Sequence, residues 1–217
     1  MKNIILLLLI GINLISCKKP INGNQLENRD GIHFEINKKT PYTGEAIVKY
    51  YESGENELKE IFKNGKRHGE SIRYYKNGEI YRKLSWLNGQ QTGKDIWYYE
   101  NGQISTQSNL INGISNGDLT NYYKSGELEF KGNLIAGKPN GDGIRLYKNG
   151  NTKYKIKWKN GKEDGEAIWY YENGKIKLKK NYKEGKLNGE IINYYDNGEI
   201  KSKENYSNGK VLKTNKY

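Results

Sequence analysis

The chain has 217 residues, one cysteine and a formal net charge of +12, from 37 Lys and Arg against 25 Asp and Glu. Hydrophobic residues make up only 34% while tyrosine alone numbers 19, which is thin for a globular core and suits a thin repeat array in which each unit contacts only its neighbours. The single cysteine excludes an intrachain disulfide, and the basic charge favours nucleic acid, anionic lipid or acidic glycan as a partner, or marks a solvated lysine-rich surface.

The first element is an apolar run at residues 4–15, preceded by Lys2. The run is too short to span a bilayer, which takes about 20 residues, and is typical of a signal peptide. Residues 14–17, Leu-Ile-Ser-Cys, resemble the bacterial lipoprotein box. The resemblance implies removal of a signal peptide at residues 1–16 and lipidation of Cys17, the alternative being an ordinary secretory signal with a chance cysteine.

The same resemblance implies a location in the bacterial cell envelope, where the protein is anchored to the membrane through the lipid on Cys17. No aspartate follows Cys17 directly, which favours the outer membrane by analogy with enterobacterial sorting. An exported protein seldom meets nucleic acid, so nucleic acid is not an expected partner. Among acidic partners, anionic polymers and lipids of the cell envelope are therefore expected before nucleic acid.

Residues 17–30 are polar and without period, and we expect a flexible tether there. Residues 31–43 imitate the second half of the repeat described next, and Ile32 and Phe34 alternate with polar residues as in a half-buried strand. This segment is predicted to be a half-repeat that caps the array, because terminal repeats are atypical. Seven repeats then fill residues 44–210, and residues 211–217 form a C-terminal tail.

The repeats are defined by a tyrosine that recurs every 24 residues. It stands at Tyr51, Tyr75, Tyr99, Tyr123, Tyr147, Tyr171 and Tyr195. A turn dipeptide follows, Asn77-Gly78 in the second copy, and a second turn, Asn88-Gly89, closes the copy. Asn-Gly between strand-like runs is a strong hairpin signal, and it tolerates positive φ at both residues of Asn77-Gly78. Each copy is therefore predicted to contribute two strands.

Period two assigns the side chains to faces. In the first strand of the second copy, Ile72 and Tyr74 share one face, which we predict to be the core face. By the same count, Ile80 and Trp86 of the second strand belong to it. Trp97 and Trp169, which occupy equivalent positions in two repeats, are predicted to lie on the opposite face. The invariant tyrosine row is expected either to cover the back of the sheet or to contact a ligand.

These features predict an all-β fold, an elongated single-sheet β-hairpin solenoid, or antiparallel meander, of about seven 24-residue repeats. At about 4.8 Å between strands, successive copies lie about 10 Å apart. The unit G-[ED]-x-I-x-Y-Y-x-N-G-x-[IL] resembles the MORN repeat in its bacterial variant form, and looks most like the tandem repeats of YwqK-family antitoxins. The resemblance covers residues 31–210. It implies a protein that is a scaffold or binds lipids or proteins, through a repeat that is not catalytic.

A lysine row recurs with the same step, which Gln107 alone interrupts, and shares one strand parity. Its members are Lys59, Lys83, Lys131, Lys155, Lys179 and Lys203. Aromatic residues complete the candidate binding surface: Tyr75, Trp97, Tyr99, Tyr123, Tyr147, Trp169, Tyr171 and Tyr195. Lysines at regular intervals suit an acidic polymer, a lipid headgroup or an acidic protein face, while the plainer interpretation is solubility and protection of sheet edges.

Nothing in the sequence predicts catalysis, a cofactor or a metal site. His33 and His68 pair with no cysteine or fixed carboxylate, and no phosphate loop or nucleophile elbow is present. An acidic row recurs at Glu45, Glu70, Asp118, Asp142, Glu166 and Glu190. Its members occupy identical environments, whereas a glycosidase pair needs carboxylates in different ones. We expect these acids to mark strand starts and to pair with lysines.

Two functions therefore stay open. The first is a non-catalytic, lipid-anchored scaffold that presents an extended face to a protein partner, with an antitoxin- or immunity-like role as one form of it. The second is binding of an anionic envelope polymer or lipid headgroups through the lysine row and the aromatic row. Salt separates them, because binding through lysines weakens steeply with ionic strength.

Overall fold

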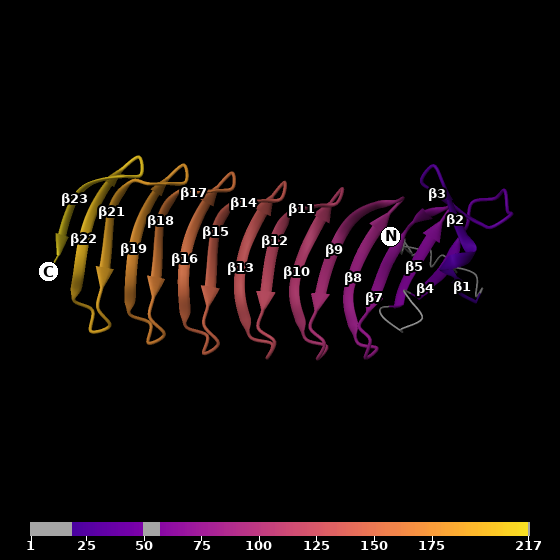
Figure 1. Ribbon diagram of the computed structural model, residues 1–217, viewed down its shortest axis with the longest axis horizontal. Helices are drawn as coiled ribbons and strands as arrows, with labels where there is room; N and C mark the ends of the chain where they lie inside the picture. Colours follow the sequence, from indigo (N-terminus) through magenta and orange to yellow (C-terminus); the bar gives the residue numbers. More distant parts are fainter. Residues whose placement is uncertain (1–18, 50–56, 217) are drawn as a thin grey trace, which may run out of the picture.

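The computed structural model describes residues 19–49 and 57–216, and Figure 1 shows them as a long row of strands that run across the axis of the molecule. One sheet of 21 strands forms the array, and a second sheet holds two strands. The predicted all-β, single-sheet hairpin array is confirmed. The signal segment, Cys17 and the first tyrosine of the row, Tyr51, lie outside the described residues.

The N-terminal end is folded from Ile21 onward, so the flexible tether predicted for residues 17–30 is shorter than expected. Its elements are β1 (Ile21–Asn22), the 3₁₀ helix η1 (Gly23–Gln25), β2 (Leu26–Arg29) and β3 (Ile32–Glu35). Strand β1 pairs in parallel with the first strand of the array, and β2 pairs with β3. Tyr42, Ala46 and Phe62 form a buried cluster, against which Ile21 and Leu26 pack. The apolar residues of the expected tether therefore cover the end of the array.

Each repeat is a hairpin, seen in Figure 1 between an upper and a lower edge. The strands that lead to the lower edge are β4 (Gly44–Lys49), β7 (Gly69–Tyr74), β9 (Gln90–Tyr98), β12 (Gly117–Tyr122), β15 (Gly141–Leu146), β18 (Gly165–Tyr170) and β21 (Gly189–Tyr194). The strands that return are β5 (Glu57–Lys63), β8 (Ile80–Leu87), β10 (Ile104–Ile111), β13 (Leu128–Ile135), β16 (Thr152–Lys159), β19 (Ile176–Lys183) and β22 (Ile200–Ser207).

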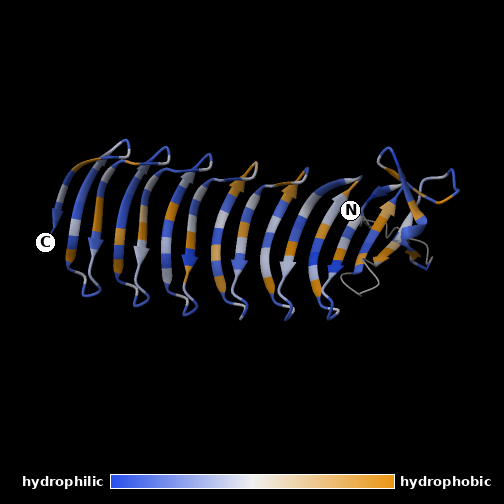
Figure 2. Cartoon of the chain, viewed as in Figure 1, coloured by the Kyte–Doolittle hydropathy of each residue, from blue (hydrophilic) through white to orange (hydrophobic). Residues whose placement is uncertain are grey.

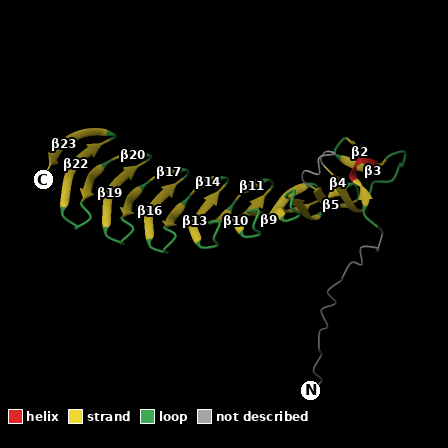
Figure 3. Cartoon of the chain, turned by 60° about the horizontal axis from the view of Figure 1, so that its bottom comes forward, coloured by secondary structure: helices red, strands yellow, loops and turns green. Residues whose placement is uncertain are grey.

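Short strands follow the upper turns. They are β6 (Lys66–Arg67), β11 (Ile114–Ser115), β14 (Lys138–Pro139), β17 (Lys162–Glu163) and β20 (Lys186–Leu187). After the last upper turn, β23 (Lys210–Lys216) pairs with β22. The segment predicted as a C-terminal tail is therefore mostly strand. Figure 3 views the same row of hairpins from below.

The two turns of repeats two to seven differ in geometry. At the upper edge both residues have positive φ, for example 52° at Asn88 and 86° at Gly89, as the type I′ hairpin requires. At the lower edge only the glycine does, with φ 85° at Gly78. The Gly78 amide donates to the Tyr75 carbonyl at 3.0 Å, which closes a type I turn before a left-handed glycine. The expectation of positive φ at Asn77 is therefore wrong, and its side chain instead accepts a hydrogen bond from the Glu79 amide at 3.0 Å.

One upper turn places a glutamate in the left-handed backbone conformation, which such a residue adopts at a cost. Glu184 has a φ of 51° where most repeats place asparagine. A left-handed conformation costs an ordinary residue about 1–2 kcal/mol, and asparagine tolerates it better. We therefore expect Glu184→Asn to raise the free energy of unfolding by about 0.5–1 kcal/mol. Urea denaturation measures the change, and Glu172→Asn in a lower turn, outside the left-handed region, is the control that should show none.

A β-bulge in repeats two to seven decides which residues share a face. Tyr74 pairs with Ile80, but Arg73 pairs with Arg82, so Tyr81 is left without a partner. The extra residue reverses the alternation for the rest of the returning strand. Ile80 therefore lies on the face of Tyr74, whereas Trp86 pairs with Gly69 and lies on the opposite one. The prediction that Trp86 and its equivalents share the face of Ile72 is wrong for this reason.

The two faces are named here by their residues. The lysine face carries the lysine row together with Ile72 and its equivalents, and the tryptophan face carries all four tryptophans. Among the strand residues that the structure describes, the buried ones other than glycine lie on the tryptophan face: Ala46, Leu58, Glu60, Phe62, Ser71, Leu84, Asp95, Ser108, Leu110, Ala167 and Ile191. Ile72 and Tyr74 on the lysine face are only half-buried. The predicted core face is therefore the wrong one.

A one-layer sheet can bury side chains on the tryptophan face because large residues lie over small ones. Gly132 and Gly143 are neighbours in the sheet, and Phe130 and Trp158 lean over them. A Cβ atom added to Gly143 would lie 2.1 Å from the Trp158 ring, and one added to Gly132 would lie 2.9 Å from the Phe130 ring. The two rings contact each other edge to face, with centroids 6.4 Å apart. Side chains of a single sheet thus pack against one another on its tryptophan face, without a second layer of helices or strands.

Candidate functional site

The lysine row forms the centre line of the lysine face. Each lysine lies directly between two residues of the neighbouring strands, and most of these are isoleucines. Lys83 lies between Ile72 and Ile96, and Lys155 between Ile144 and Ile168. Since strands lie about 4.8 Å apart, the lysines recur about every 10 Å, as their parity predicts. The face therefore offers alternating aliphatic and cationic side chains over the length of the array.

One member of the row is held in an ion pair. Lys59 Nζ lies 2.8 Å from Glu45 Oε2. The hydrogen bond from Lys59 to the Glu45 carboxylate raises the pKa of Lys59 above its usual value. The predicted pairing of the acidic row with lysines is seen here. Among the described residues, the other five lysines of the row form no ion pair within 4.0 Å.

The candidate tryptophans do not join the lysines. Trp97 pairs with Arg82 and Trp169 with Tyr154, all on the tryptophan face. Arg82 lies over the Trp97 ring at 4.1 Å, and the Tyr154 and Trp169 rings are 6.2 Å apart. These side chains are therefore engaged within the sheet, and the combined surface of lysines and tryptophans expected from the sequence is divided between opposite faces.

The invariant tyrosines link consecutive repeats. In five of them the phenol hydroxyl donates a hydrogen bond to a backbone carbonyl of the next repeat. The donors and acceptors are Tyr75 to Tyr98 at 2.6 Å, and Tyr99 to Tyr122, Tyr123 to Leu146, Tyr147 to Tyr170 and Tyr171 to Tyr194, each at 2.8 Å. Burial, as the first cause, raises the pKa of both Tyr75 and Tyr123. The row therefore has a structural role that explains its invariance without a ligand.

Removing one of these hydroxyls tests that role. Tyr123→Phe should lower the free energy of unfolding by about 1 kcal/mol, the usual value of one hydrogen bond. The raised pKa means that the folded protein holds the proton more tightly than the unfolded chain, so this contribution is present below about pH 10 and is lost as the pH rises through the folded pKa. Denaturation curves of both proteins should therefore differ at pH 7 and converge in strong alkali. A constant difference would contradict the assigned bond.

A buried ionic cluster on the tryptophan face has no counterpart in the sequence predictions. Arg82 donates to both carboxylate oxygens of Asp95, at 2.7 and 2.9 Å, and Trp97 Nε1 donates to Asp95 Oδ2 at 3.1 Å. Asp95 is 6% exposed. The equivalent residues in other repeats are small or apolar, such as Gly143 and Ala167. That contrast within the repeat pattern is the signal that marks Asp95 in the sequence.

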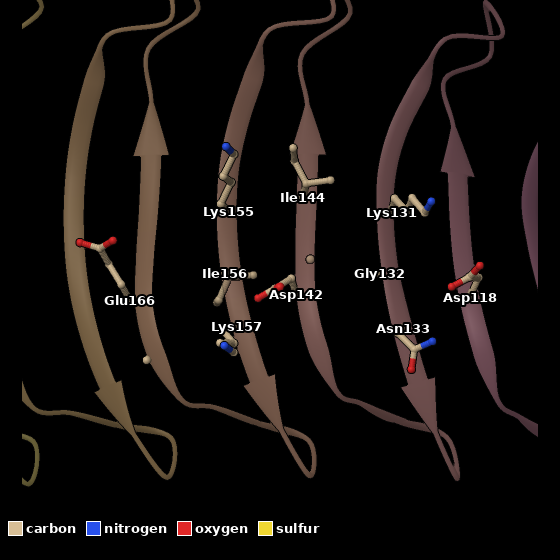
Figure 4. A pocket seen from close by; sticks show the side chains of 12 residues that line it. Asp118, Lys131, Gly132, Asn133, Asp142, Ile144, Lys155, Ile156, Lys157 and Glu166 are labelled. Atoms are coloured by element: carbon tan, nitrogen blue, oxygen red, sulfur yellow. The ribbon is translucent and has the colours of Figure 1, made fainter.

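A shallow pocket of about 680 Å³ lies on the lysine face, between β12 and β18. Figure 4 shows its side chains, which come from equivalent positions of three consecutive repeats. The charged ones are Asp118, Lys131, Asp142, Lys155, Lys157 and Glu166. The acids occupy the same slot of successive repeats, so the pocket has the repeated character of a contact surface and lacks two carboxylates in contrasting environments.

Exposed aliphatic side chains gather at the upper edge in repeats two to four. They form what we call the upper patch: Leu87 (52% exposed), Ile111 (54%), Ile114 (51%) and Ile135 (54%). Figure 2 shows hydrophobic colour at these upper turns, whereas the turns toward the C-terminus are hydrophilic. The patch is absent from the binding surface predicted from the sequence. Its signal in the sequence is an aliphatic residue beside the upper turn, where most other repeats place lysine.

Within the part of the chain that the structure describes, no cluster of three or more His, Cys, Asp or Glu side chains is placed to hold a metal ion. His33 lies in β3 and His68 between β6 and β7. His33 Nδ1 is 3.0 Å from the Gly65 carbonyl oxygen. No helix among the residues described here is long and apolar enough to cross a membrane.

Comparison with known proteins agrees with this repeat organisation. Four segments of the chain match the MORN repeat variant, residues 67–88, 91–112, 163–184 and 187–214. No curated protein matches the chain. The predicted resemblance to MORN repeats is confirmed over these four segments, whereas the resemblance to YwqK-family antitoxins and the lipoprotein signal peptide stay predictions.

Proposed function

We propose that this chain, four segments of which match the MORN repeat variant, is a non-catalytic scaffold of the bacterial cell envelope. Its lysine face binds a protein partner. The observation that carries the proposal is the open lysine face, where aliphatic and cationic side chains alternate along the array and five of the six lysines form no ion pair within the described residues. Extended surfaces of repeat arrays commonly bind other macromolecules.

The family match supports the general part of the proposal. MORN repeats are generally protein- or membrane-binding motifs, and the family is non-catalytic. Neutralising a toxin protein, as an antitoxin or immunity protein does, would be one form of such binding. The mixed charges on the lysine face suit a protein surface with charges of both signs.

A second candidate function is supported by the unpaired lysines. A row of cations at intervals of about 10 Å would follow an anionic envelope polymer or a layer of lipid headgroups. Binding of this kind is mainly electrostatic, so it weakens steeply as salt is added. The tryptophans lie on the opposite face and would take no part in it.

One experiment tests both candidates. The full chain, kept in detergent and immobilised, is exposed to detergent-solubilised envelope, and captured material is eluted with rising salt. The scaffold proposal expects one dominant protein that withstands high salt, whereas glycan or lipid released at low salt would favour the second candidate. Replacing Lys131, Lys155 and Lys179 by glutamine, the residue at Gln107 of the same row, should reduce capture. Equal capture by this variant would overturn the assignment of the lysine face.

The control for that variant removes equal charge elsewhere. The substitutions Lys76→Gln, Lys124→Gln and Lys148→Gln lie in lower turns, away from the lysine row. They should leave capture nearly unchanged. If these substitutions reduce capture as much as the lysine-face variant does, net charge rather than a defined face governs binding.

We further propose that the protein is anchored through a lipid on Cys17, with the outer membrane as the favoured location. Cys17→Ser removes the thiol that takes the lipid, so the variant should move from the membrane pellet to the soluble fraction. Fractionation followed by immunoblotting measures the shift. A variant that still sediments with membranes after a high-salt wash would contradict the anchor.

A further inference from the structure

We propose that the upper patch docks an amphipathic α-helix of a protein partner, with acidic residues beside its apolar stripe. This inference rests on the proposed scaffold function, and it assigns the partner's chemistry at one margin of the lysine face. Leu87 follows Trp86 of the tryptophan face, so its side chain lies on the lysine side of the sheet. Ile111 pairs with Ile114 across the same turn. The patch is therefore reached from the lysine face.

The patch is held rigidly by bonds between successive upper turns. Each turn glycine donates to a carbonyl of the preceding repeat, as Gly113 does to Gln91 and Gly137 to Ser115, both at 2.8 Å. Ile114 packs against the next turn, where a Cβ atom on Gly137 would lie 3.4 Å from its side chain. A ligand thus meets aliphatic groups that are already positioned, which lowers the entropic cost of binding.

The charges around the patch define the flanks of the ligand. Lysines occupy most of the other positions next to the upper-turn dipeptides: Lys63, Lys66, Lys138, Lys159, Lys162, Lys183, Lys186 and Lys210. Gln90 and Ser207 fill the remaining two, so no carboxylate stands directly beside an upper-turn dipeptide. An aliphatic patch with lysines on both sides along the edge complements an apolar stripe with acidic flanks.

The spacing of the patch residues matches the repeat of an α-helix better than that of an extended chain. Leu87, Ile111 and Ile135 occupy one position in three consecutive repeats, so they recur about every 10 Å. Residues seven apart on an α-helix are separated by about 10.5 Å and lie on nearly the same side. A helix along the upper edge therefore brings one apolar turn against each hairpin. Extended chain rises about 3.3 Å per residue and alternates its sides every residue, so its period does not match this spacing.

The geometry of the turns disfavours a bilayer as the occupant. The aliphatic residues stand one position behind the turn apex, which is Asn88-Gly89, Asn112-Gly113 or Ala136-Gly137. Pressing the patch into lipid would bury these apices first, with asparagine side chains and backbone groups of the exposed turn. Burying polar groups without partners is costly. A helix laid against the lysine side contacts the aliphatic groups and leaves the apices in water.

The probe is a synthetic helical peptide of about 18 residues, about 27 Å long. It carries leucine at positions i, i+3, i+4, i+7, i+11 and i+14, and glutamate on its flanks. Binding to the full chain in detergent is measured by fluorescence anisotropy. The double variant Ile111→Lys/Ile135→Lys installs the residue that Lys159 and Lys183 already provide at this position, so the turns should fold. It should raise the Kd at least about tenfold, since two aliphatic contacts are lost.

Two controls accompany the measurement. Leu212→Lys changes an exposed aliphatic residue of β23, 65% exposed and outside the patch, and should leave the Kd unchanged. A peptide with the same leucines but lysine flanks should bind more weakly than the acidic one. Absence of saturable binding by the acidic peptide, or equal binding by the double variant, would overturn the proposal.

Further outcomes separate this inference from the function on which it rests. Vesicles of phosphatidylcholine and phosphatidylglycerol are tested alongside. If the double variant loses vesicle binding and the peptide does not bind, the occupant is a lipid surface and the helix is excluded. If the double variant still captures the envelope protein at full yield, the scaffold function stands and the upper patch is not the docking site.

Discussion

Replacing Asp95 with alanine should lower the free energy of unfolding by about 3 kcal/mol, the largest loss we expect from a single charged residue. The substitution removes the acceptor of two hydrogen bonds from Arg82 and one from Trp97. The Arg82 side chain is 24% exposed, so it would keep its charge in a partly desolvated position without a partner. Urea denaturation at neutral pH measures the loss.

The repeats provide a matched rescue for this variant. Leu178 and Ile191 occupy the positions equivalent to Arg82 and Asp95. The double variant Arg82→Leu/Asp95→Ile therefore copies a pair that the array already accommodates, and removes the stranded charge. We expect it to recover most of the lost stability, because replacing a buried ion pair by apolar residues is often neutral. If the double variant is no more stable than Asp95→Ala, the cost does not arise from the unpaired arginine.

Introducing leucine at Gly143 should cost about 2–3 kcal/mol, the upper range for overpacking a well-filled site. A Cβ atom at this position would lie 2.1 Å from the Trp158 ring, so the indole must leave its place over the glycine. The change is expected as a lower urea midpoint. Tryptophan fluorescence should shift to longer wavelength in the folded variant, because the displaced indole becomes more exposed.

A second substitution tests whether that cost is a packing conflict. Leu119 and Leu134 occupy the equivalent two positions in the preceding repeat, where two leucines replace the pair of a glycine and a tryptophan. Trp158→Leu added to Gly143→Leu reproduces this pair and should restore at least half of the lost stability. Trp158→Leu alone should be destabilising, since it opens space above Gly143. Additive losses in the double variant would show that the two positions are independent, contrary to the structure.

The fold was largely predictable because the same pattern of turn and strand residues occurs in seven consecutive repeats. The glycine and tyrosine steps at Tyr75, Tyr99 and Tyr123 predicted the hairpins, and the structure has them in register. Side-chain faces were not predictable by counting in twos. The extra residue at Tyr81 looks like any other strand residue, yet it reverses the alternation after it. The direction of the core, assigned to the side of Ile72, was also wrong, because large side chains on the opposite face pack over small residues such as Gly143.

The candidate site was predictable only in part. Period two places Lys83 and its equivalents on one face because all of them lie on the same side of the bulge. Counting in twos without the bulge puts Trp97 on the face of Lys83, so the separation of tryptophans from lysines was not predictable. Nothing in the spacing shows that Arg82 covers the Trp97 ring either. The positions of Ile111 and Ile135 beside the upper turns are visible in the sequence, whereas the extent to which their side chains protrude follows from the turn geometry. The hydrogen bonds from the tyrosine hydroxyls could not be predicted from the sequence, because they depend on the distance between neighbouring repeats in the folded protein.

The orientation of the strands across the long axis has a mechanical consequence. Hydrogen bonds between antiparallel strands are perpendicular to the strands, so in this array they point along its length. Tension along the axis would therefore load the bonds at one strand boundary and peel that hairpin away before the next is stressed. Resistance would be low and repeated, once per repeat. Between an anchored end and a bound partner, such an array would behave as an extensible spacer that lengthens hairpin by hairpin.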